Sequence, residues 1–282
     1  MNDDYQLVQL ANGTFTVRSL THSETFHPVA GPMAEAEALY VHQLNLRERI
    51  GQRAEEFVIW DIGLGAGANA LTALRCTSDL AKPIHVISFD RTTAALEFAL
   101  KHAEKLRYVC GFENHLRTLI DHGHVEIQNG SAQVRWQSVI DDFPTTLACA
   151  RPGLASPHAI FFDAYSPTRN PDMWTLPVLQ NLHAMIDPLR PCSLATYSRS
   201  TMARAALLLA GFFVGVGEAI AEKEETTIAA NCRDLIPRLL DAKWLDRARR
   251  SHGAEPLHNG TYVQRPLAPE TWRKLCDHSQ FK

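Results

Sequence analysis

Short apolar runs that end on an acidic residue recur along the middle of this chain, and helical segments separate them. "FVIWDIG" spans residues 57–63, "IHVISFD" spans residues 84–90, and "AIFF" at 159–162 is followed directly by Asp163. The segments "ANALTALRC" and "TTAALEFALKHAEKL" between them have the apolar spacing of helices. Strands that alternate with helices predict an α/β fold, a Rossmann-like doubly wound domain with a mostly parallel sheet.

Two further patterns complete the predicted sheet. Asn129 and Gly130 stand between two segments of alternating polarity, which predicts a β-hairpin over residues 124–140. "PCSLATYS", "FFVGVGEAI" and "TTIAANC" predict later strands, and the last two form an antiparallel pair. We therefore expect an antiparallel terminal strand at the end of the sheet.

The segments on either side of this region follow other patterns. We expect an N-terminal extension over residues 1–50, with a strand in "GTFTVRS" and a helix that begins near Pro32. The central domain covers residues 51–232. A C-terminal tail covers residues 233–282, and it begins with a basic amphipathic helix and ends in a loose, Pro-rich segment.

Composition excludes several classes of protein. The formal net charge is −3, so no global basic field indicates nucleic acid, although a local basic patch could still bind it. Six cysteines without a CxxC pair indicate reduced thiols in a cytosolic protein. The acidic start lacks the apolar run of a signal peptide, and no run is long enough for a membrane helix. We expect a cytoplasmic protein.

A glycine-rich loop follows the first apolar run of the central domain. In "DIGLGAGANAL", Gly63, Gly65 and Gly67 allow a tight turn and a close approach of the backbone to a ligand, and the next helix points its N–H groups at the same place. The spacing G-x-G-x-G differs from the dinucleotide fingerprint G-x-G-x-x-G. It is the spacing that we associate with S-adenosyl-L-methionine, whose sulfonium carries no phosphate. The alternative is a plain strand–helix turn.

The acids at the strand ends are candidates for one common site. In open α/β sheets ligands bind beyond the carboxyl ends of the strands, where Asp61, Asp90 and Asp163 are expected. Asp90 is the candidate for ribose hydroxyls. Asp142, with Asp141 as the alternative, is the candidate for the adenine amine. Each acid could instead cap a turn or a helix.

No metal site and no hydrolase triad is indicated. His122-Gly-His124 is interpreted as a turn, because no partner cluster has metal-ligand spacing. A GxSxG elbow is absent from the sequence.

The most specific motif is "DAYSPTRNPDMW" at residues 163–174. It resembles the D-[AG]-[FY]-[SA]-P-x-x-N-P-[DE]-[ML]-W loop of the methyltransferases that complete 5-methylaminomethyl-2-thiouridine in tRNA, the MnmC/MnmD type. "DIGLGAGANALTAL", "ISFDR" and "VRWQSVIDDFP" are similar to the family's cofactor loop, ribose acid and hairpin. The resemblance covers about residues 13–231, and it places Glu35 at an acidic position of the lead-in segment.

This resemblance implies a class I methyltransferase that uses S-adenosyl-L-methionine and acts on tRNA. The acceptor would be the primary amine of an aminomethyl group on a modified wobble uridine. Asp163 would take the proton of that amine, and Tyr165 would form an aromatic wall. Glu35, Asn170, Arg169 and Lys223 would contact the substrate. For Asn170, a plain turn with Pro171 is an equal alternative.

The sequence also departs from the family. Asp141 stands where glycine is common, and Glu222, Glu224 and Glu225 surround Lys223 where the family is more basic. The bifunctional members carry a flavin oxidase domain after the methyltransferase, and this chain is too short for one. We therefore expect a stand-alone methyltransferase that takes its aminomethyl substrate from another enzyme.

Alternative functions remain open at this point. The same scaffold could methylate an amine of a small molecule or a protein, or it could bind the cofactor without catalysis. The basic segment "RLLDAKWLDRARR" could hold RNA phosphates, although such a charge run is more commonly a solvated face. The sequence indicates no oligomeric state.

Overall fold

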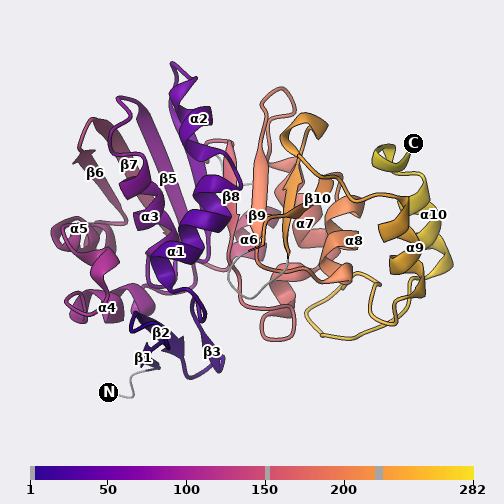
Figure 1. Cartoon of the computed structure of the whole chain (residues 1–282), viewed down its shortest axis with the longest axis horizontal. Helices are drawn as coiled ribbons and strands as arrows, with labels where there is room; N and C mark the ends of the chain where they lie inside the picture. Colours follow the sequence, from indigo (N-terminus) through magenta and orange to yellow (C-terminus); the bar gives the residue numbers. More distant parts are fainter. Residues whose placement is uncertain (1–3, 150–152, 220–224) are drawn as a thin grey trace.

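The computed structural model describes residues 4–149, 153–219 and 225–282, and it contains two sheets (Figure 1). The small sheet has the order β1-β2-β3 and the large one β10-β11-β9-β8-β4-β5-β7-β6. The strands are β1 Tyr5–Gln9, β2 Phe15–Ser19, β3 Glu24–Thr25, β4 Phe57–Ile62, β5 Pro83–Asp90, β6 His124–Asn129, β7 Ala132–Ile140, β8 Ala159–Phe162, β9 Ser193–Thr196, β10 Phe213–Gly217 and β11 Thr226–Ala230. The α-helices are α1 Pro32–Ala36, α2 Leu46–Gly51, α3 Ala68–Cys76, α4 Ala94–Lys101, α5 Glu113–His122, α6 Phe143–Ala148, α7 Leu176–Ala184, α8 Thr201–Leu209, α9 Ala242–Arg250 and α10 Pro269–Cys276.

The centre of the large sheet is parallel, as predicted. β4 pairs in parallel with β5 on one side and β8 on the other, and β8 pairs in parallel with β9. All six residues of β4 are buried, because helices cover both faces of the sheet (Figure 1). Neighbouring residues of β4 point to opposite faces, so Ile59 packs in one apolar cluster and Trp60 in the other.

Both ends of the large sheet are antiparallel. β6 and β7 form the predicted hairpin, and Gly130 in its turn has a φ of 59°, the left-handed region that favours glycine. At the other end β11 lies between β9 and β10 and is antiparallel to both. The predicted antiparallel pair is therefore present at this end of the sheet, with β10 as the edge strand.

The helix predicted from Pro32 is divided into three parts. α1 passes directly into a π-helical segment, Glu37–His42, and Asn45 then takes a left-handed φ of 48° before α2 begins. Asparagine tolerates that conformation better than most residues. The wide π turn contains Tyr40, which is fully buried and whose ring lies 4.5 Å from that of Phe161.

The C-terminal tail differs from its prediction. The expected long basic helix is interrupted at Pro237, and α9 begins only after Asp241, whose side chain accepts a hydrogen bond from the Trp244 N–H. The segment expected to be loose is packed, because Leu257 and Leu275 are buried in the apolar cluster that also contains α8. Figure 1 shows α9 and α10 closing the end of the molecule opposite β6 and α5.

Other features of the described residues bear on the class of protein. No helix among them has the length and apolarity needed to cross a membrane. All six cysteines are free, as the absence of a CxxC pair predicts. Within these residues no group of three His, Cys, Asp or Glu side chains is arranged to hold a metal ion.

A buried polar chain crosses three strands of the large sheet. Asp61 on β4 is 0% exposed and accepts a hydrogen bond of 2.7 Å from the Ser88 hydroxyl on β5. The Trp136 indole N–H on β7 donates in turn to Ser88 at 2.9 Å. The second carboxyl oxygen of Asp61 has no hydrogen-bond partner among the described residues. Burial raises the pKa of Asp61 to about 8, so this side chain is a neutral acid below that pH.

Replacing Leu275 tests whether the tail belongs to the core. Leu275→Ala removes a fully buried side chain from α10, and we expect a loss of about 2–5 kcal/mol in the free energy of unfolding. Chemical denaturation measures that loss, and Arg273→Ala on the exposed side of α10 is the control, with an expected change within about 0.5 kcal/mol. Equal stability of the two variants would show that the tail is only loosely attached.

Replacing Asp61 tests its buried protonation. Its pKa in the folded protein lies above the unfolded value, so between these two pH values only the folded state keeps the proton. The contribution of Asp61 to stability therefore falls as pH rises toward 8, by at most about 1.4 kcal/mol per pH unit. We expect the free energy of unfolding, measured by denaturation at several pH values between about 5 and 8, to decrease less with pH for Asp61→Asn than for the wild type. The variant Asp121→Asn changes an exposed acid and should follow the wild type. The same dependence of stability on pH in all three proteins would contradict the buried protonation of Asp61.

Candidate functional site

A cavity of about 620 Å³ lies at the carboxyl ends of the parallel strands, under the small N-terminal sheet. Ligand pockets commonly have volumes of about 300–1,000 Å³, so this cavity can hold a nucleoside-sized molecule. Residues at or just after the ends of five neighbouring strands form part of the cavity wall. The wall includes Gly63 and Gly65 after β4, Asp90 at the end of β5, Asp141 after β7, Asp163 after β8 and Ser198 after β9.

The glycine loop is fixed between the ends of β5 and β8. The N–H groups of Gly63 and Leu64 donate to the Phe89 carbonyl, and the Gly65 N–H donates to the Asp90 carboxylate at 2.8 Å. Gly63 has a φ of 98°, and a Cβ atom there would lie 2.6 Å from the backbone oxygen of Asp163. Glycine is therefore required at this position by both conformation and contact.

Asp90 combines burial with free acceptor capacity. One of its oxygens takes the Gly65 N–H and the other takes the Arg91 N–H at 2.7 Å. Burial raises the pKa of Asp90 above its ordinary value, and these backbone hydrogen bonds oppose that shift. A carboxylate offers about four lone-pair positions, so Asp90 can also accept hydrogen bonds from hydroxyl groups in the cavity.

The two acids after β7 have different positions. Asp141 lines the cavity together with Phe143. Asp142 caps α6, where it accepts the Thr145 N–H at 3.1 Å, and it accepts a hydrogen bond of 2.9 Å from Arg91. Asp141 is among the residues that line the cavity, and Asp142 is not, so the geometry favours the alternative of the two acids for contact with a ligand.

Asp163 is held by a chain of polar side chains. The Asn69 amide N–H donates to Asp163 at 2.6 Å, and the Asn69 amide oxygen lies 2.9 Å from His27 Nε2. Because an ionised carboxylate only accepts, the Asn69 amino group must face Asp163 and its oxygen must face His27. His27 then donates from Nε2. This imidazole is 9% exposed, and its Nδ1 has no hydrogen-bond partner among the described residues.

Two phenols stand on the same side of Asp163. Burial raises the pKa of Tyr40 well above its ordinary value, and the negative charge of Asp163 raises it further. Burial likewise raises the pKa of Tyr197, with contributions from Asp163 and Glu35. Both groups therefore keep their protons at neutral pH, and the phenol of Tyr40 lies close enough to Asp163 to be affected by its charge.

Glu35 shapes the wall that faces Tyr197. It is 3% exposed, and one of its oxygens accepts the backbone N–H groups of Val29, Ala30 and Gly31 at 2.8–3.1 Å. This single side chain fixes the lead-in loop between β3 and α1. Glu35 lines the cavity and also organises its wall.

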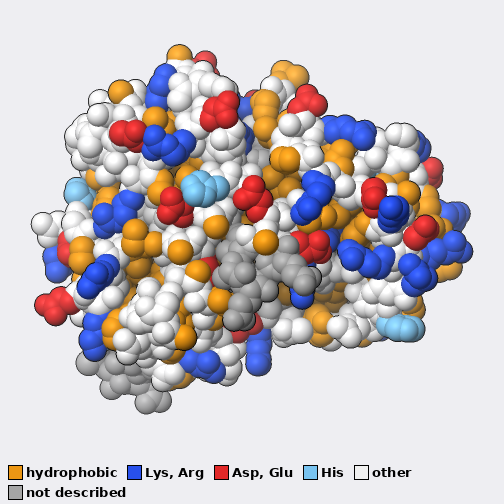
Figure 2. All heavy atoms as spheres, viewed as in Figure 1, with side chains coloured by type: hydrophobic (Ala, Val, Ile, Leu, Met, Phe, Trp, Pro, Cys, Tyr) orange, Lys and Arg blue, Asp and Glu red, His pale blue; other side chains and the backbone are white. Residues whose placement is uncertain are grey.

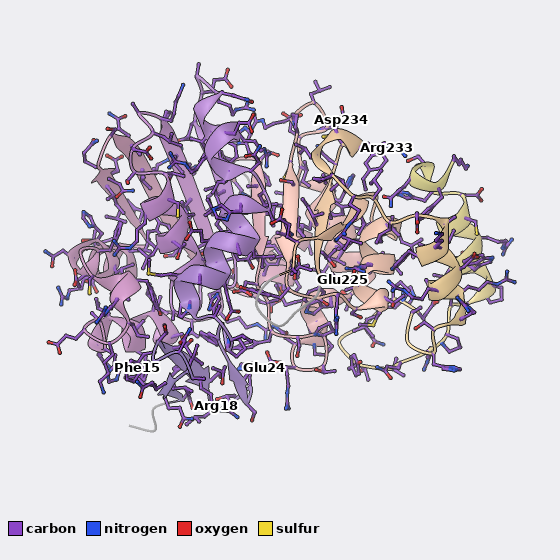
Figure 3. All side chains as sticks on the ribbon, in the orientation of Figure 1. Phe15, Arg18, Glu24, Glu225, Arg233 and Asp234 are labelled. Carbon is purple, nitrogen blue, oxygen red and sulfur yellow. The ribbon has the colours of Figure 1, made fainter. Side chains whose placement is uncertain are left out.

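The proline-rich loop after Asp163 is cross-linked by hydrogen bonds. The Trp174 indole donates to the Tyr165 carbonyl at 2.8 Å, and the Asn170 N–H donates to the Ser166 carbonyl at 2.9 Å. Ser166 also donates to Glu24, which Figure 3 labels on the small N-terminal sheet. The Tyr165 ring stacks on His22 with 4.0 Å between ring centroids. The loop is therefore rigid and holds an aromatic pair against the cavity.

The remaining predicted residues fall in different places. Tyr165 and Asn170 line the cavity with Asp163, whereas Arg169 is exposed outside its wall. Asp61 lies inside the sheet beneath the cavity, so it is not in position to touch a ligand directly. Lys223 lies outside the described residues.

Several residues of the site were not predicted from the sequence. They are His22, His27, Tyr40, Asn69 and Tyr197. They come from widely separated segments and form no local motif. The lead-in segment contains His27 and Tyr40, and the glycine-loop segment contains Asn69, but neither pattern predicted a role for these side chains.

Comparisons with known proteins agree with this geometry. A family model described as S-adenosyl-L-methionine-dependent methyltransferase matches residues 115–232. The tRNA 5-methylaminomethyl-2-thiouridine biosynthesis bifunctional protein MnmC of Burkholderia mallei is 26% identical over 211 residues, which is 70% of this chain and 31% of that protein. The protein of the same name from Paraburkholderia phymatum is 27% identical over 210 residues, or 70% and 30% of the two chains. The chain thus spans about a third of the length of these relatives.

Solved structures share the fold. The structure of MnmC2 from Aquifex aeolicus has a TM-score of 0.70 and 23% identity, and covers 97% of this chain and 83% of that chain. Spermidine synthase from Thermotoga maritima has a TM-score of 0.52 and 11% identity, with 95% and 78% of the two chains covered. Residues 115–232 are thus similar to S-adenosyl-L-methionine-dependent methyltransferases, the chain is similar to part of MnmC proteins, and its fold is that of MnmC2.

Proposed function

We propose that this protein methylates the primary amine of an aminomethyl group on a modified wobble uridine of tRNA. The observation that carries the proposal is the position of Asp163, which lines the cavity directly beside the glycine loop and is oriented by Asn69. The names of the curated relatives point to the same tRNA modification. An enzyme that forms the aminomethyl group must act before this protein.

The residues of the cavity fit the methyl donor. S-adenosyl-L-methionine supplies a methyl group bound to a sulfonium, which is electrophilic without further activation. We assign the glycine loop, Gly63 to Gly67, to the amino-acid end of the donor. Asp90 is the acceptor for the ribose hydroxyls, and Asp141 with Phe143 forms the wall for the adenine.

Asp163 has the chemistry that an amine acceptor needs. An alkylammonium ion has no lone pair, so it must lose a proton before it can attack a methyl group. A carboxylate in hydrogen-bond reach can hold the ammonium and take that proton. Asn69 donates to one oxygen of Asp163, and the carboxylate keeps further acceptor positions for a group in the cavity. The fixed loop holds Asp163 in one place, as positioning of the reactants requires.

Tyr165 and Asn170 complete the acceptor side of the cavity. The stacked rings of Tyr165 and His22 offer an aromatic face to a base that is turned out of its stack, which is a common way of reading RNA loops. Asn170 lines the same wall, and its amide is the candidate for a hydrogen bond to that base.

The direct test of the function is methyl transfer to tRNA from cells that lack this activity. Such tRNA carries the unmethylated aminomethyl group, and the product is identified as the methylaminomethyl nucleoside after digestion. Free aminomethyl nucleoside and polyamines serve as competing acceptors. Transfer to the amines but not to tRNA would contradict the proposal and leave a methyltransferase for small-molecule amines.

The cofactor assignment predicts different effects for two neighbouring acids. In Asp90→Asn the side chain has one acceptor oxygen and not two. Its amino group then faces one of the two backbone N–H groups that Asp90 binds, and fewer oxygen lone pairs remain for the ribose hydroxyls. We expect weaker binding of S-adenosyl-L-methionine by about 1–3 kcal/mol, measured by calorimetry. Asp142→Asn is the matched control, because Asp142 caps α6 outside the cavity wall and its replacement should leave affinity unchanged. Equal affinities in the two variants would remove Asp90 from the site.

The acid assignment predicts a pH-dependent defect. Asp163→Asn keeps the shape and can still accept from Asn69, but it cannot take the proton of the amine. We expect single-turnover methylation to slow by roughly two to four orders of magnitude at neutral pH, with less loss at high pH where more of the amine is already free. Asp172→Asn in the same loop, exposed and outside the cavity wall, should retain the wild-type rate. A rate defect of Asp163→Asn that does not change with pH would argue against proton transfer.

A further inference from the structure

The charges of this protein are distributed unevenly along the chain. Residues 233–282 contain ten Lys and Arg and six Asp and Glu, so this segment has a net charge of +4. The other 232 residues contain eighteen Lys and Arg and twenty-five Asp and Glu, a net charge of −7. Figure 2 shows Lys and Arg side chains gathered over the end of the molecule where Figure 1 places α9 and α10. A protein with a mildly acidic average thus has one basic end.

The helix α9 displays the basic side chains on a fixed face. Trp244, Leu245 and Ala248 are buried, so the helix is held with its opposite face outward. Lys243, Arg247 and Arg250 follow at the i, i+4, i+7 spacing of one face, and all three are exposed. No carboxylate among the described residues forms an ion pair with any of them, and Asp246 is the single acid within the helix. These cations are available to an anionic partner.

One more exposed cation, Arg199, stands next to the cavity wall in the sequence. Ser198 belongs to the cavity wall, and the next residue, Arg199, is exposed. Burial lowers the pKa of the Arg204 guanidinium at the start of α8, and the nearby charges of Arg247 and Arg199 lower it further. Both cations are therefore close to the same buried group. Arg204 itself is bound to Glu225, which Figure 3 labels, so it is not part of the exposed face.

The cavity and the basic surface together favour one class of amine substrate over another. The cavity presents Asp90 and Asp163, which suit a substrate that is positively charged at its reacting end. Arg199, the residue after the wall residue Ser198, and the cations of α9 would repel a small free ammonium ion at long range. The same cations attract an amine that is attached to a polyanion, because the phosphates beside it meet the basic face.

We propose that Arg199 and the outer face of α9, formed by Lys243, Arg247 and Arg250, bind the phosphate backbone of the RNA whose modified base enters the cavity. The proposal rests on the function proposed above and adds the surface that holds the substrate. Cations on such a surface give affinity and speed of encounter without reading sequence, and their contribution decreases with salt. Recognition of the modified base remains with the cavity.

The test compares two triple variants with the same change of charge. Lys243→Gln/Arg247→Gln/Arg250→Gln removes three cations from α9, and Lys101→Gln/Arg107→Gln/Arg117→Gln removes three exposed cations at the α4–α5 end. Dissociation constants for hypomodified tRNA are measured between about 50 and 200 mM salt. We expect the α9 variant to bind tRNA about 10- to 100-fold more weakly at low salt, with a plot of log K against log salt that is less steep by about 2–3. The control variant should keep the wild-type slope.

Other measurements separate this inference from the function on which it rests. Calorimetry with S-adenosyl-L-methionine and turnover of the free aminomethyl nucleoside, if wild type accepts it, should be unchanged in the α9 variant. If wild-type protein methylates tRNA and both triple variants have the same salt slope, the α9 surface is wrong and the function stands. If wild-type protein does not methylate tRNA at all, the function itself is wrong. Weaker binding of S-adenosyl-L-methionine by the α9 variant would show that the helix supports the structure of the cavity. That result would contradict the proposed RNA-binding role of the α9 surface.

Discussion

The contact between the backbone of Gly63 and the backbone of Asp163 determines how the site is assembled. β4 and β8 are adjacent parallel strands, so the turns that follow them meet at one edge of the sheet. A Cβ atom on Gly63 would lie 2.6 Å from the Asp163 carbonyl oxygen, and the Asp163 N–H is bound to the Ile62 carbonyl at 2.9 Å. The glycine loop that we propose for the methyl donor and the acid that we propose for the acceptor therefore keep a fixed distance from each other. Methyl transfer requires the donor and the acceptor to be aligned. A fixed distance between their binding groups lowers the entropy cost of that alignment.

The sequence was sufficient for the parallel core, because each strand is a short apolar run and each turn has its own signal. Asn129-Gly130 located the hairpin, and the acids located the functional edge of the sheet. The choice between Asp141 and Asp142 was not accessible in this way. β7 ends at Ile140, and side chains at a strand end point to different sides from one residue to the next, so only the structure assigns Asp141 to the cavity.

Long-range packing explains the other differences from the sequence-based expectations. Leu257 and Leu275 are isolated apolar residues among polar ones, and a pattern-based prediction has no reason to bury them until α8 is in place beside them. His27 and Asn69 are 42 positions apart, and they meet only because the lead-in segment folds over the glycine loop. Asp61 has the strand-end pattern of a ligand acid, but β4 extends one residue further and places its carboxyl inside the sheet, against Ser88.

The acidic groups at this edge of the sheet differ in environment, and these differences are consistent with the roles that we propose for them. Asp61 is completely buried with a pKa near 8, so it is neutral at physiological pH and adds little negative field to the cavity. Asp90 is stabilised by backbone N–H groups, which suit an acceptor of hydroxyl hydrogen bonds. Asp163 accepts a hydrogen bond from the Asn69 amide, which comes from another segment of the chain. This contact orients the carboxylate, and an oriented carboxylate suits an ammonium substrate.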